Sequence, residues 1–404
     1  MLLQIAWRNI WRNKVRSWVV IGAIMLGLWS ILFIVAFTAA MVGGYVKKAI
    51  KNETSHYQLH HPEFKEDKEV EFIIPNVQEA MDKVRALPEV KAATLRTIVS
   101  GMVSSARGSR VINIRGVIPE SEIAVTGFDS NIKEGRFLEE KKKNEIIISQ
   151  KLAERLKLKL RKKVVLQFQG LDENILSGAF RIVGIFSTGN TRWDEQIVLV
   201  NRKDLNRLFQ REALAHEVAI YLNDVATLDT MGTQLKNQFP NLLVENYREV
   251  SPDVQLYESQ IDISGTILTT IFMIALIFGI INTMLMAVLE RRKELGMLMA
   301  VGMNKRKVFS MVVLETLLLG LFAAPFGLLL GWLTITWFGN RGINLQGFSQ
   351  SLEHVGMETQ IYTYLPSPYY LYLGIAIFIT ALLASLYPAW KAIRLRPVEA
   401  IRTI

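Results

Sequence analysis

Four long apolar stretches that are almost free of charge limit this chain to few folds. Residues 17–46 and 263–289 contain no charged side chain, residues 359–390 contain none, and residues 308–338 carry only Glu315. Each stretch exceeds the roughly 20 apolar residues that cross a hydrocarbon core of about 30 Å. None shows the polar face, repeating every 3.6 residues, that a soluble core helix would have. The sequence therefore predicts a membrane protein with four transmembrane α-helices, at 17–46, 263–289, 308–338 and 366–390.

The net charge of +10 is spread unevenly over the segments between these stretches. Residues 1–16, 290–307 and 391–404 together hold 14 positive and 3 negative charges, whereas residues 47–262 hold 32 positive and 31 negative charges. Short cytoplasmic loops carry such an excess of Lys and Arg, and long domains cross a membrane largely regardless of charge. We therefore expect both termini and the 290–307 loop in the cytoplasm and residues 47–262 outside. Nucleic-acid binding is not needed to explain the basic pI.

The segment before the first span predicts an amphipathic helix at the cytoplasmic membrane surface, over residues 1–16. Its apolar side chains share one helical stripe, beside two basic residues: Leu3, Trp7, Ile10 and Trp11, with Arg8 and Arg12. Tryptophans are expected at the level of the lipid headgroups, and arginines towards anionic lipid. The alternative is that this segment simply continues the first span. That span is too long for the apolar core of a cleaved signal peptide, so we expect it to remain as a signal anchor.

Residues 47–262 predict a mixed α/β domain inserted between spans one and two. Strand patterns occur at 55–60, 90–101, 110–117, 164–168, 180–186, 197–200 and 218–222. Helices are expected after Asn76, Ser149 and Asn201, over 226–239, and as a stalk over 249–262 that runs into span two. This order predicts α/β pieces at about 52–120 and 201–250 that flank a β-rich insertion at about 121–200. An outer loop at 339–365 and a cytoplasmic tail at 391–404 complete the chain.

Motifs that would carry catalysis do not stand out in the sequence. It contains no G-x-x-x-x-G-K-[ST] phosphate loop, no HExxH, and no cysteine for a disulfide or a thiolate metal site. His56, His60 and His61 are close together, but a strand would turn His61 away from the other two. A solvated strand face is therefore favoured over a metal site, and a charged surface accounts for the acidic residues of the domain. We predict no catalytic residue, no metal and no cofactor in this chain.

Glu315 is the only charge within the third span. Channels and carriers line their pathways with polar residues, and these spans offer almost none. Glu315 lies about two helical turns after Lys307, which favours a structural role over proton transport. Its side chain is expected to reach back to the interface or to pair with an arginine at the cytoplasmic end. The spans are therefore expected to transmit motion rather than to enclose an aqueous path.

Residues 290–307 predict a short amphipathic helix that a cytoplasmic partner can push. Leu295, Leu298 and Met299 form an apolar stripe, and Gly302 is placed to end the helix. This segment resembles the coupling-helix signature of the FtsX/MacB-type ABC transporter permeases, roughly ERRxEIGxLxAxGxxxxxI. The matching residues are Glu290, Arg291, Arg292, Glu294, Gly296, Leu298, Ala300 and Gly302. With Leu295 and Met303 they form the predicted ATPase-coupling site.

Further motifs carry the same resemblance over the rest of the chain. The opening Ala6-Trp7-Arg8-Asn9 and the ending, with Tyr387-Pro388-Ala389-Trp390 and Arg396-Pro397-Val398-Glu399, are similar to the family's terminal motifs. Four shorter segments resemble the lipoprotein-releasing (LolC/LolE) permeases: 55–62, which is similar to a GHxQIHxP strand, 87–90, 115–120 and 134–138. The chain departs from them at Arg161-Lys162-Lys163, where relatives often have Gly-Asp.

The resemblance implies a multi-pass subunit of an ABC transporter in the inner membrane, with a MacB-like periplasmic core domain. A separate ATPase subunit dimer, which binds Mg-ATP, would dock under the coupling helices of two paired permeases, identical or different. In lipoprotein release, the spans take a lipid-anchored protein from the outer leaflet and hand it to a periplasmic carrier. Alternatives with the same architecture export a peptide or a small toxic molecule, or activate a cell-wall hydrolase. A membrane-anchored sensor is an alternative of a different class.

Overall fold

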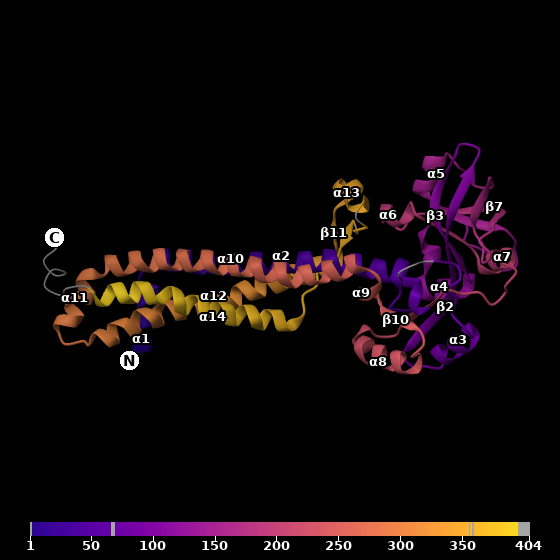
Figure 1. Ribbon diagram of the computed structural model, residues 1–404. Helices are drawn as coiled ribbons and strands as arrows, with labels where there is room; N and C mark the ends of the chain where they lie inside the picture. Colours follow the sequence, from indigo (N-terminus) through magenta and orange to yellow (C-terminus); the bar gives the residue numbers. More distant parts are fainter. Residues whose placement is uncertain (1, 66–68, 355, 358, 395–404) are drawn as a thin grey trace. The chain divides into compact units, whose positions relative to one another are not determined.

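The computed structural model describes residues 2–65, 69–354, 356–357 and 359–394, which divide into two compact units (Figure 1). The helical unit comprises residues 1–41, 259–344 and 360–404, and the α/β unit comprises residues 42–258 and 345–359. Two long helices, α2 (Lys14–Ala49) and α10 (Pro252–Glu290), contribute to both units.

The helical unit contains the apolar helices that the sequence predicts. Within the described residues, four helices are long and apolar enough to cross a membrane, over Ser17–Thr54, Pro252–Glu290, Lys305–Arg341 and Ser367–Ile393. The last two are α12 (Lys305–Arg341) and α14 (Ser367–Ile393). The shorter elements of this unit are α1 (Leu2–Arg12), α11 (Arg292–Ala300) and a small ribbon of β11 (Ile343–Asn344) and β12 (Gln360–Ile361). The predicted fold class, four long apolar helices with an α/β domain between the first two, is confirmed.

Small residues allow α2 and α12 to approach each other closely. A Cβ atom added at Gly327 would lie 3.0 Å from the Cβ of Leu28 and 3.1 Å from the carbonyl oxygen of Met25. One added at Gly331 would lie 3.1 Å from the Cβ of Leu32. Glycines four residues apart are a common helix interface in membranes, where packing rather than burial from water drives association.

The α/β unit is built on one mixed sheet. In its described residues the strand order is β10-β1-β9-β2-β3-β8-β5-β7-β4, and β6 pairs with β2 and β7. The strands are β1 (Tyr57–His60), β2 (Val90–Ser105), β3 (Gly108–Val117), β4 (Ile132–Gly135), β5 (Glu145–Ser149), β6 (Lys163–Gln169), β7 (Ile175–Phe186), β8 (Ile197–Asn201), β9 (Glu217–Leu222) and β10 (Leu243–Asn246). The β3–β8 and β5–β7 pairs are parallel and the others are antiparallel. The long hairpin of β2 and β3 lies within this order, with β9 beside β2 and β8 beside β3.

Short helices connect the strands and cover the sheet. They are α3 (Val77–Arg85), α4 (Pro119–Thr126), α5 (Gln150–Leu156), α6 (Thr191–Asp194), α7 (Arg202–Leu208), α8 (Leu228–Gln238), α9 (Tyr247–Val250) and α13 (Ser349–His354). Single turns lie at Ile50–Thr54 (η1), Pro62–Lys65 (η2), Phe128–Asn131 (η3), Val225–Thr227 (η4) and Gln346–Phe348 (η5).

Two of the three helix starts predicted from capping residues have the expected contacts. The Ser149 hydroxyl accepts a hydrogen bond from the Leu152 amide at 3.1 Å, and the Asn201 side chain accepts one from Lys203 at 3.1 Å. Asn76 does precede α3, but it adopts a left-handed conformation and its side chain makes no capping bond. The helix therefore begins where the sequence predicts, but Asn76 does not cap it with its side chain. Asparagine tolerates the left-handed region, which here turns the chain into the helix.

The expectation of a solvated histidine face on the first strand is wrong. His56 and His60 are buried, because aromatic side chains cover their rings: Tyr221 lies 4.3 Å from His56, and Phe64 stacks on His60 at 5.1 Å, both between ring centroids. The Leu222 amide donates to His56 Nδ1 at 2.9 Å, and the His60 ring lies 3.0 Å from both the His216 carbonyl and Gln58 Oε1. Backbone and side-chain groups thus satisfy these rings, and the described residues contain no group of side chains suited to a metal.

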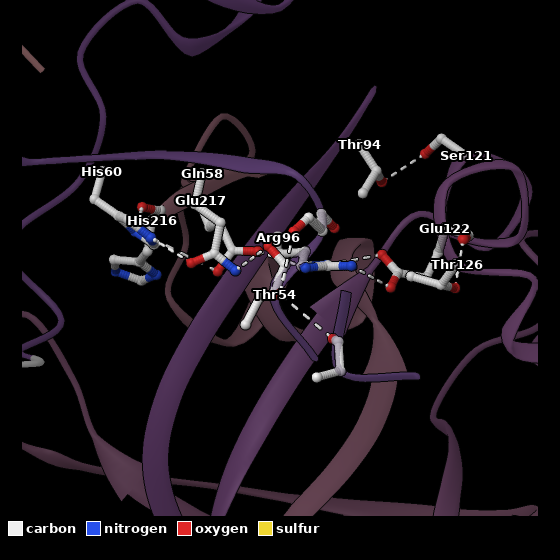
Figure 2. A network of polar contacts seen from close by, with 12 residues as sticks. Thr54, Gln58, His60, Thr94, Arg96, Ser121, Glu122, Thr126, His216 and Glu217 are labelled. Atoms are coloured by element: carbon white, nitrogen blue, oxygen red, sulfur yellow. Dashed lines mark hydrogen bonds and ion pairs between the residues drawn. The ribbon is translucent and has the colours of Figure 1, made fainter. Parts of the chain in front are cut away.

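The assignment of the domain's acidic residues to a charged surface is also wrong for six of them, which are buried: Glu122, Glu145, Asp194, Asp204, Glu217 and Glu245. Glu122 on α4 and Glu217 on β9 are almost completely buried, on either side of Arg96 (Figure 2). Arg96 donates to Glu122 at 2.7 and 2.9 Å and to Glu217 at 2.6 Å. Burial alone lowers the pKa of Arg96, but the two carboxylates outweigh it and raise that pKa above its ordinary value. The three side chains form a charged core within the unit.

Candidate coupling site

The helix α11, which follows α10 directly, lies in the segment predicted to receive force from a partner. It ends as the sequence predicts: Gly302 has a φ of +103°, which favours glycine. The Gly302 amide donates to the Met299 carbonyl at 3.2 Å, and the Met303 amide to the Leu298 carbonyl at 2.9 Å. This pair of bonds is the Schellman arrangement, which stops a helix by turning the chain away from its axis. Asn304 then caps α12 by accepting from the Arg306 amide at 3.2 Å.

The two faces of α11 differ in what they contact. Leu295 and Gly296 are buried, and Met299 and Met303 pack against the core of the helical unit. Leu298 is half-buried. The opposite face is exposed, with Met297 at 55% and Val301 at 85% of full exposure. The predicted coupling residues therefore divide into an inner set, which holds the helix in place, and an exposed outer set of Glu290, Ala300 and Gly302. Met297 and Val301, which the sequence did not single out, belong to the same exposed face.

Arg291, between α10 and α11, forms a buried ion pair with Glu315 on α12. Its Nη1 donates to the two carboxylate oxygens of Glu315 at 3.0 and 3.2 Å, and its Nη2 donates to the Asn9 carbonyl on α1 at 2.8 Å. Arg291 is 8% exposed and Glu315 is 4% exposed. The predicted pairing of Glu315 with an arginine is thus confirmed. One guanidinium joins the start of the coupling helix to α1 and α12.

A second ion pair ties α11 to α1 at the surface. Arg12 Nη2 donates to both carboxylate oxygens of Glu294, at 2.7 and 2.6 Å. Both side chains are about half exposed, at 52% and 47%. The sequence predicts contact with lipid for Arg12 and a place in the coupling signature for Glu294, but it does not predict that the two side chains pair. They are far apart in the sequence, and their opposite charges are the only sequence feature that is consistent with a contact.

The helix α1 packs on the bundle through its aromatic side chains. Trp11 lies 5.6 Å from the Phe322 ring on α12, Trp7 lies 6.1 Å from it, and both contacts are edge-to-face. The helix ends at Arg12, and α2 begins anew at Lys14, so the alternative that α1 merely continues the first span is wrong. Leu3, Trp7 and Arg8 remain exposed, and their contact with lipid headgroups stays a prediction.

These contacts surround a cavity of about 260 Å³ between α1, α10, α11 and α12. Its walls combine apolar residues with both ion pairs, and they include Ile5, Met284, Met311, Arg291 and Glu294. Because α11 is not tightly packed on this side, it has room to shift against the bundle. Any shift of α11 would have to move or break the two ion pairs, which join this segment to α1 and α12.

Models of two known protein families match the sequence of this chain. A model of the MacB-like periplasmic core domain matches residues 17–238, more than half of the chain. A model of the FtsX-like permease C-terminal region matches residues 266–397. The chain belongs to the FtsX/MacB family of ABC transporter permeases. The FtsX-like region contains the whole coupling site except α1, and both models describe permease regions rather than an ATPase domain.

Individual relatives of this FtsX/MacB-type permease are distant. An uncharacterized ABC transporter permease of Methanocaldococcus jannaschii is 25% identical over 69% of this chain and 66% of its own length. The lipoprotein-releasing system transmembrane protein LolC of Xylella fastidiosa is 22% identical over 55% of each chain. The matches thus span about half to two thirds of the relatives' length. The solved periplasmic region of MacB from Actinobacillus actinomycetemcomitans is 13% identical, with a TM-score of 0.37, over 52% of this chain and 97% of that one.

Membership in this family has one direct consequence for this permease. The chain is a multi-pass membrane protein, with four candidate spans among the residues that the structure describes. The predicted C-terminal motif from Arg396 onwards lies outside the described residues, whereas Tyr387 to Trp390 lie in the last turns of α14.

Proposed function

We propose that this permease transmits the ATP-driven motion of a separate ATPase subunit dimer from α11 to its α/β domain. The observation that supports this most directly is the division of α11 into an exposed outer face and an inner face held by two ion pairs. A partner that binds Met297 and Val301 would move Arg291 and Glu294 with the helix. The buried Arg291–Glu315 pair would carry that displacement into α12, and the Arg12–Glu294 pair would carry it into α1.

The experiment that tests this role compares two exposed valines in the full chain. Val301→Asp places a charge on the outer face of α11, where an apolar partner surface would have to desolvate it. Val111→Asp makes the same change at a residue of β3 that is 75% exposed. The first variant should lose both binding and stimulation of the ATPase subunit, and the second should keep both. Full ATP turnover and pull-down with Val301→Asp would contradict the proposed docking face.

The proposed topology places α11, α1 and both termini in the cytoplasm and the α/β domain on the outer side of the inner membrane. The charge distribution supports it. Because the chain contains no cysteine, single-cysteine variants report on topology cleanly. Gln150→Cys in the α/β domain should react in intact cells with a thiol reagent that does not cross the membrane, and Ala300→Cys should react only after lysis. Equal labelling of both in intact cells would overturn the arrangement.

For the cargo, we propose a lipid-anchored protein, taken from the outer leaflet by a pair of permease subunits and passed to a periplasmic carrier. The support is the similarity to LolC and the four short motifs of the α/β domain. Each acyl chain contributes about 0.8 kcal/mol per buried CH₂, so extraction requires an input such as ATP hydrolysis. Photo-crosslinking in membranes should trap acylated proteins against the permease in an ATP-dependent manner. If peptides are trapped instead, the result would favour peptide export. If a cell-wall hydrolase is trapped, it would favour activation of that hydrolase.

A further inference from the structure

One face of the sheet in the α/β unit carries a row of polar residues that crosses six strands. Strand register places Glu245 opposite Gln58, Glu217 opposite Arg96, Arg115 opposite Ile98, and Asn113 opposite both Ser100 and Ile197. Residues opposite each other in a sheet point to the same face. The other face, by contrast, carries apolar side chains such as Val99 and Ile114 into a hydrophobic core.

This polar face forms the floor of a cavity of about 440 Å³, a size typical of ligand sites. Its walls come from the turns η1 and η2, from α6, and from the end of α9 with the residue that follows it. Apolar groups line it together with polar ones, notably Trp193, Phe64 and Ile197. The cavity is distinct from the coupling site, whose residues all lie in the helical unit.

All the charged side chains that line this cavity, except one, have a partner of their own. Lys65 pairs with Glu245, Glu217 pairs with Arg96, and Glu53 accepts a hydrogen bond from Asn190 at 2.7 Å. The exception is Arg115, whose Nε has no hydrogen-bond partner among the described residues. Its guanidinium lies over the Trp193 ring, 5.6 Å from the centroid. Burial and the nearby charge of Arg96 lower the pKa of Arg115, and the carboxylates of Glu217, Glu122 and Glu53 oppose that shift without cancelling it. An anion in direct contact with the guanidinium would stabilise its charge further.

The surroundings of Arg115 restrict the kind of anion. Three glutamates line the same cavity, so a doubly charged phosphate would meet more repulsion than a singly charged carboxylate. A guanidinium matches a carboxylate in shape and can bind it with two parallel hydrogen bonds. The side-chain amides of Asn113 and Gln196 also line the cavity and can bind the backbone amides of a peptide. We propose that this cavity binds a polypeptide segment through a carboxylate held by Arg115 beside Trp193.

A ligand in this cavity would contact the two segments that lead into long helices. Glu53 and Thr54 belong to the turn that follows α2, and Val250 and Ser251 immediately precede α10. An occupant would therefore touch both segments through which the α/β unit continues into long apolar helices. This inference concerns a binding site alone, and it holds whether or not the proposed ATPase docking face is correct.

The test uses the full chain, labelled with 5-fluorotryptophan, in phosphatidylcholine nanodiscs. Trp193 is the only tryptophan between residues 42 and 258, and Trp193→Phe assigns its ¹⁹F resonance. The probes are acetyl-Leu-Asp-Leu-amide, its Asn counterpart, and propionate. The Asp peptide should shift the Trp193 resonance saturably, at a concentration at least tenfold lower than the Asn peptide requires. Propionate, which offers one carboxylate without the peptide, should bind more weakly than the Asp peptide.

Two variants identify the residue responsible. Arg115→Gln should weaken binding of the Asp peptide at least tenfold, whereas Arg110→Gln, at an exposed residue on the other face of β3, should leave it unchanged. An unchanged melting temperature of Arg115→Gln establishes that it folds. Equal shifts with the Asp and Asn peptides, no shift at all, or unchanged binding to folded Arg115→Gln would each overturn the proposal. Tighter binding of propionate than of the peptide would overturn the polypeptide and point to a small carboxylic acid as the ligand.

Discussion

Arg291 in the helical unit and Arg96 in the α/β unit are both buried arginines held by glutamate, but their surroundings differ. Arg96 is fully buried between two carboxylates, Glu122 and Glu217, and it connects strands with a helix that packs on them. Arg291 has one carboxylate, Glu315, and one carbonyl, and it lies beside a cavity and an exposed helix. The first arrangement resists movement. The second joins three helices through a few bonds that can break and re-form, which suits a contact that transmits motion.

The largest effect is expected from Arg96→Leu. This change leaves two buried carboxylates without their cation, and breaking a buried ion pair in this way costs about 3–5 kcal/mol for each pair measured. We expect the α/β unit to unfold or become sensitive to protease at 25 °C. Limited proteolysis and circular dichroism of the purified chain would detect this. Arg110→Leu, at an exposed arginine on β3, should be neutral. A protease-resistant Arg96→Leu domain would remove the contrast between the two arginines.

The next effect should come from Glu315→Leu, which leaves Arg291 without its carboxylate. Arg291 keeps the Asn9 carbonyl and lies close to the exposed end of the bundle, so we expect a loss near the lower end, about 3 kcal/mol. The double variant Arg291→Leu with Glu315→Leu removes both charges and should recover most of that stability.

The double variant also separates stability from coupling. If the pair transmits motion, the double variant should bind the ATPase subunit and still fail to stimulate its ATP turnover. Thermal unfolding in detergent measures the first property and ATP hydrolysis measures the second. Normal stimulation by a stable double variant would show that the pair is only structural, like that of Arg96.

A pH-dependent effect is expected from His216, beside the charged core of the α/β unit. Its Nδ1 accepts from the Ile98 amide at 3.0 Å and its Nε2 lies 3.0 Å from the Val70 carbonyl, so the neutral ring fits its place. Burial lowers its pKa from 6.5 to about 4. A depressed histidine pKa means that the unfolded state binds more protons, so stability is complete above pH 6.5 and falls between pH 6.5 and 4. The loss at pH 4 should be roughly 3 kcal/mol.

The variant His216→Gln isolates this contribution, because glutamine can accept and donate in the same directions without titrating. Urea unfolding at several pH values should show the wild type losing its advantage over His216→Gln as the pH falls from 7 to 4. Val111→Gln, at an exposed residue that does not titrate, is the control and should give a difference that does not change with pH. A constant difference for His216→Gln would mean that the ring is not held neutral.

Much of this architecture follows from local patterns. Uncharged stretches of sufficient length predict the four long helices, and a glycine after an amphipathic run predicts the end of α11 at Gly302. Glu315 could be matched with an arginine, because a lone charge in an apolar span must find a partner. In each case the prediction depends only on residues that are close together in the sequence.

What the sequence could not predict depends on contacts between distant segments. Whether His56 is buried depends on β9, which supplies Tyr221 and pairs with β1 from about 160 positions away. The core around Arg96 needs the register of β2 against β9 as well as the placement of α4. The Gly327–Gly331 spacing could have been recognised as a helix interface, but its partner on α2 could not.

The smallest effect is expected from the exposed pair of Arg12 and Glu294. Both side chains are about half in solvent, where ion pairs contribute about 0.2–1 kcal/mol. A double-mutant cycle with Arg12→Ala and Glu294→Ala should give a coupling energy in that range, and it should shrink as salt is raised. The charge-reversed pair, Arg12→Glu with Glu294→Arg, should restore it. Under the proposed function a weak bond can still matter, because a contact that opens during each ATPase cycle cannot cost much to break. A coupling energy above about 2 kcal/mol, insensitive to salt, would mean that α1 is locked to α11 as firmly as Arg96 is to its glutamates, and the two units would then not differ as argued.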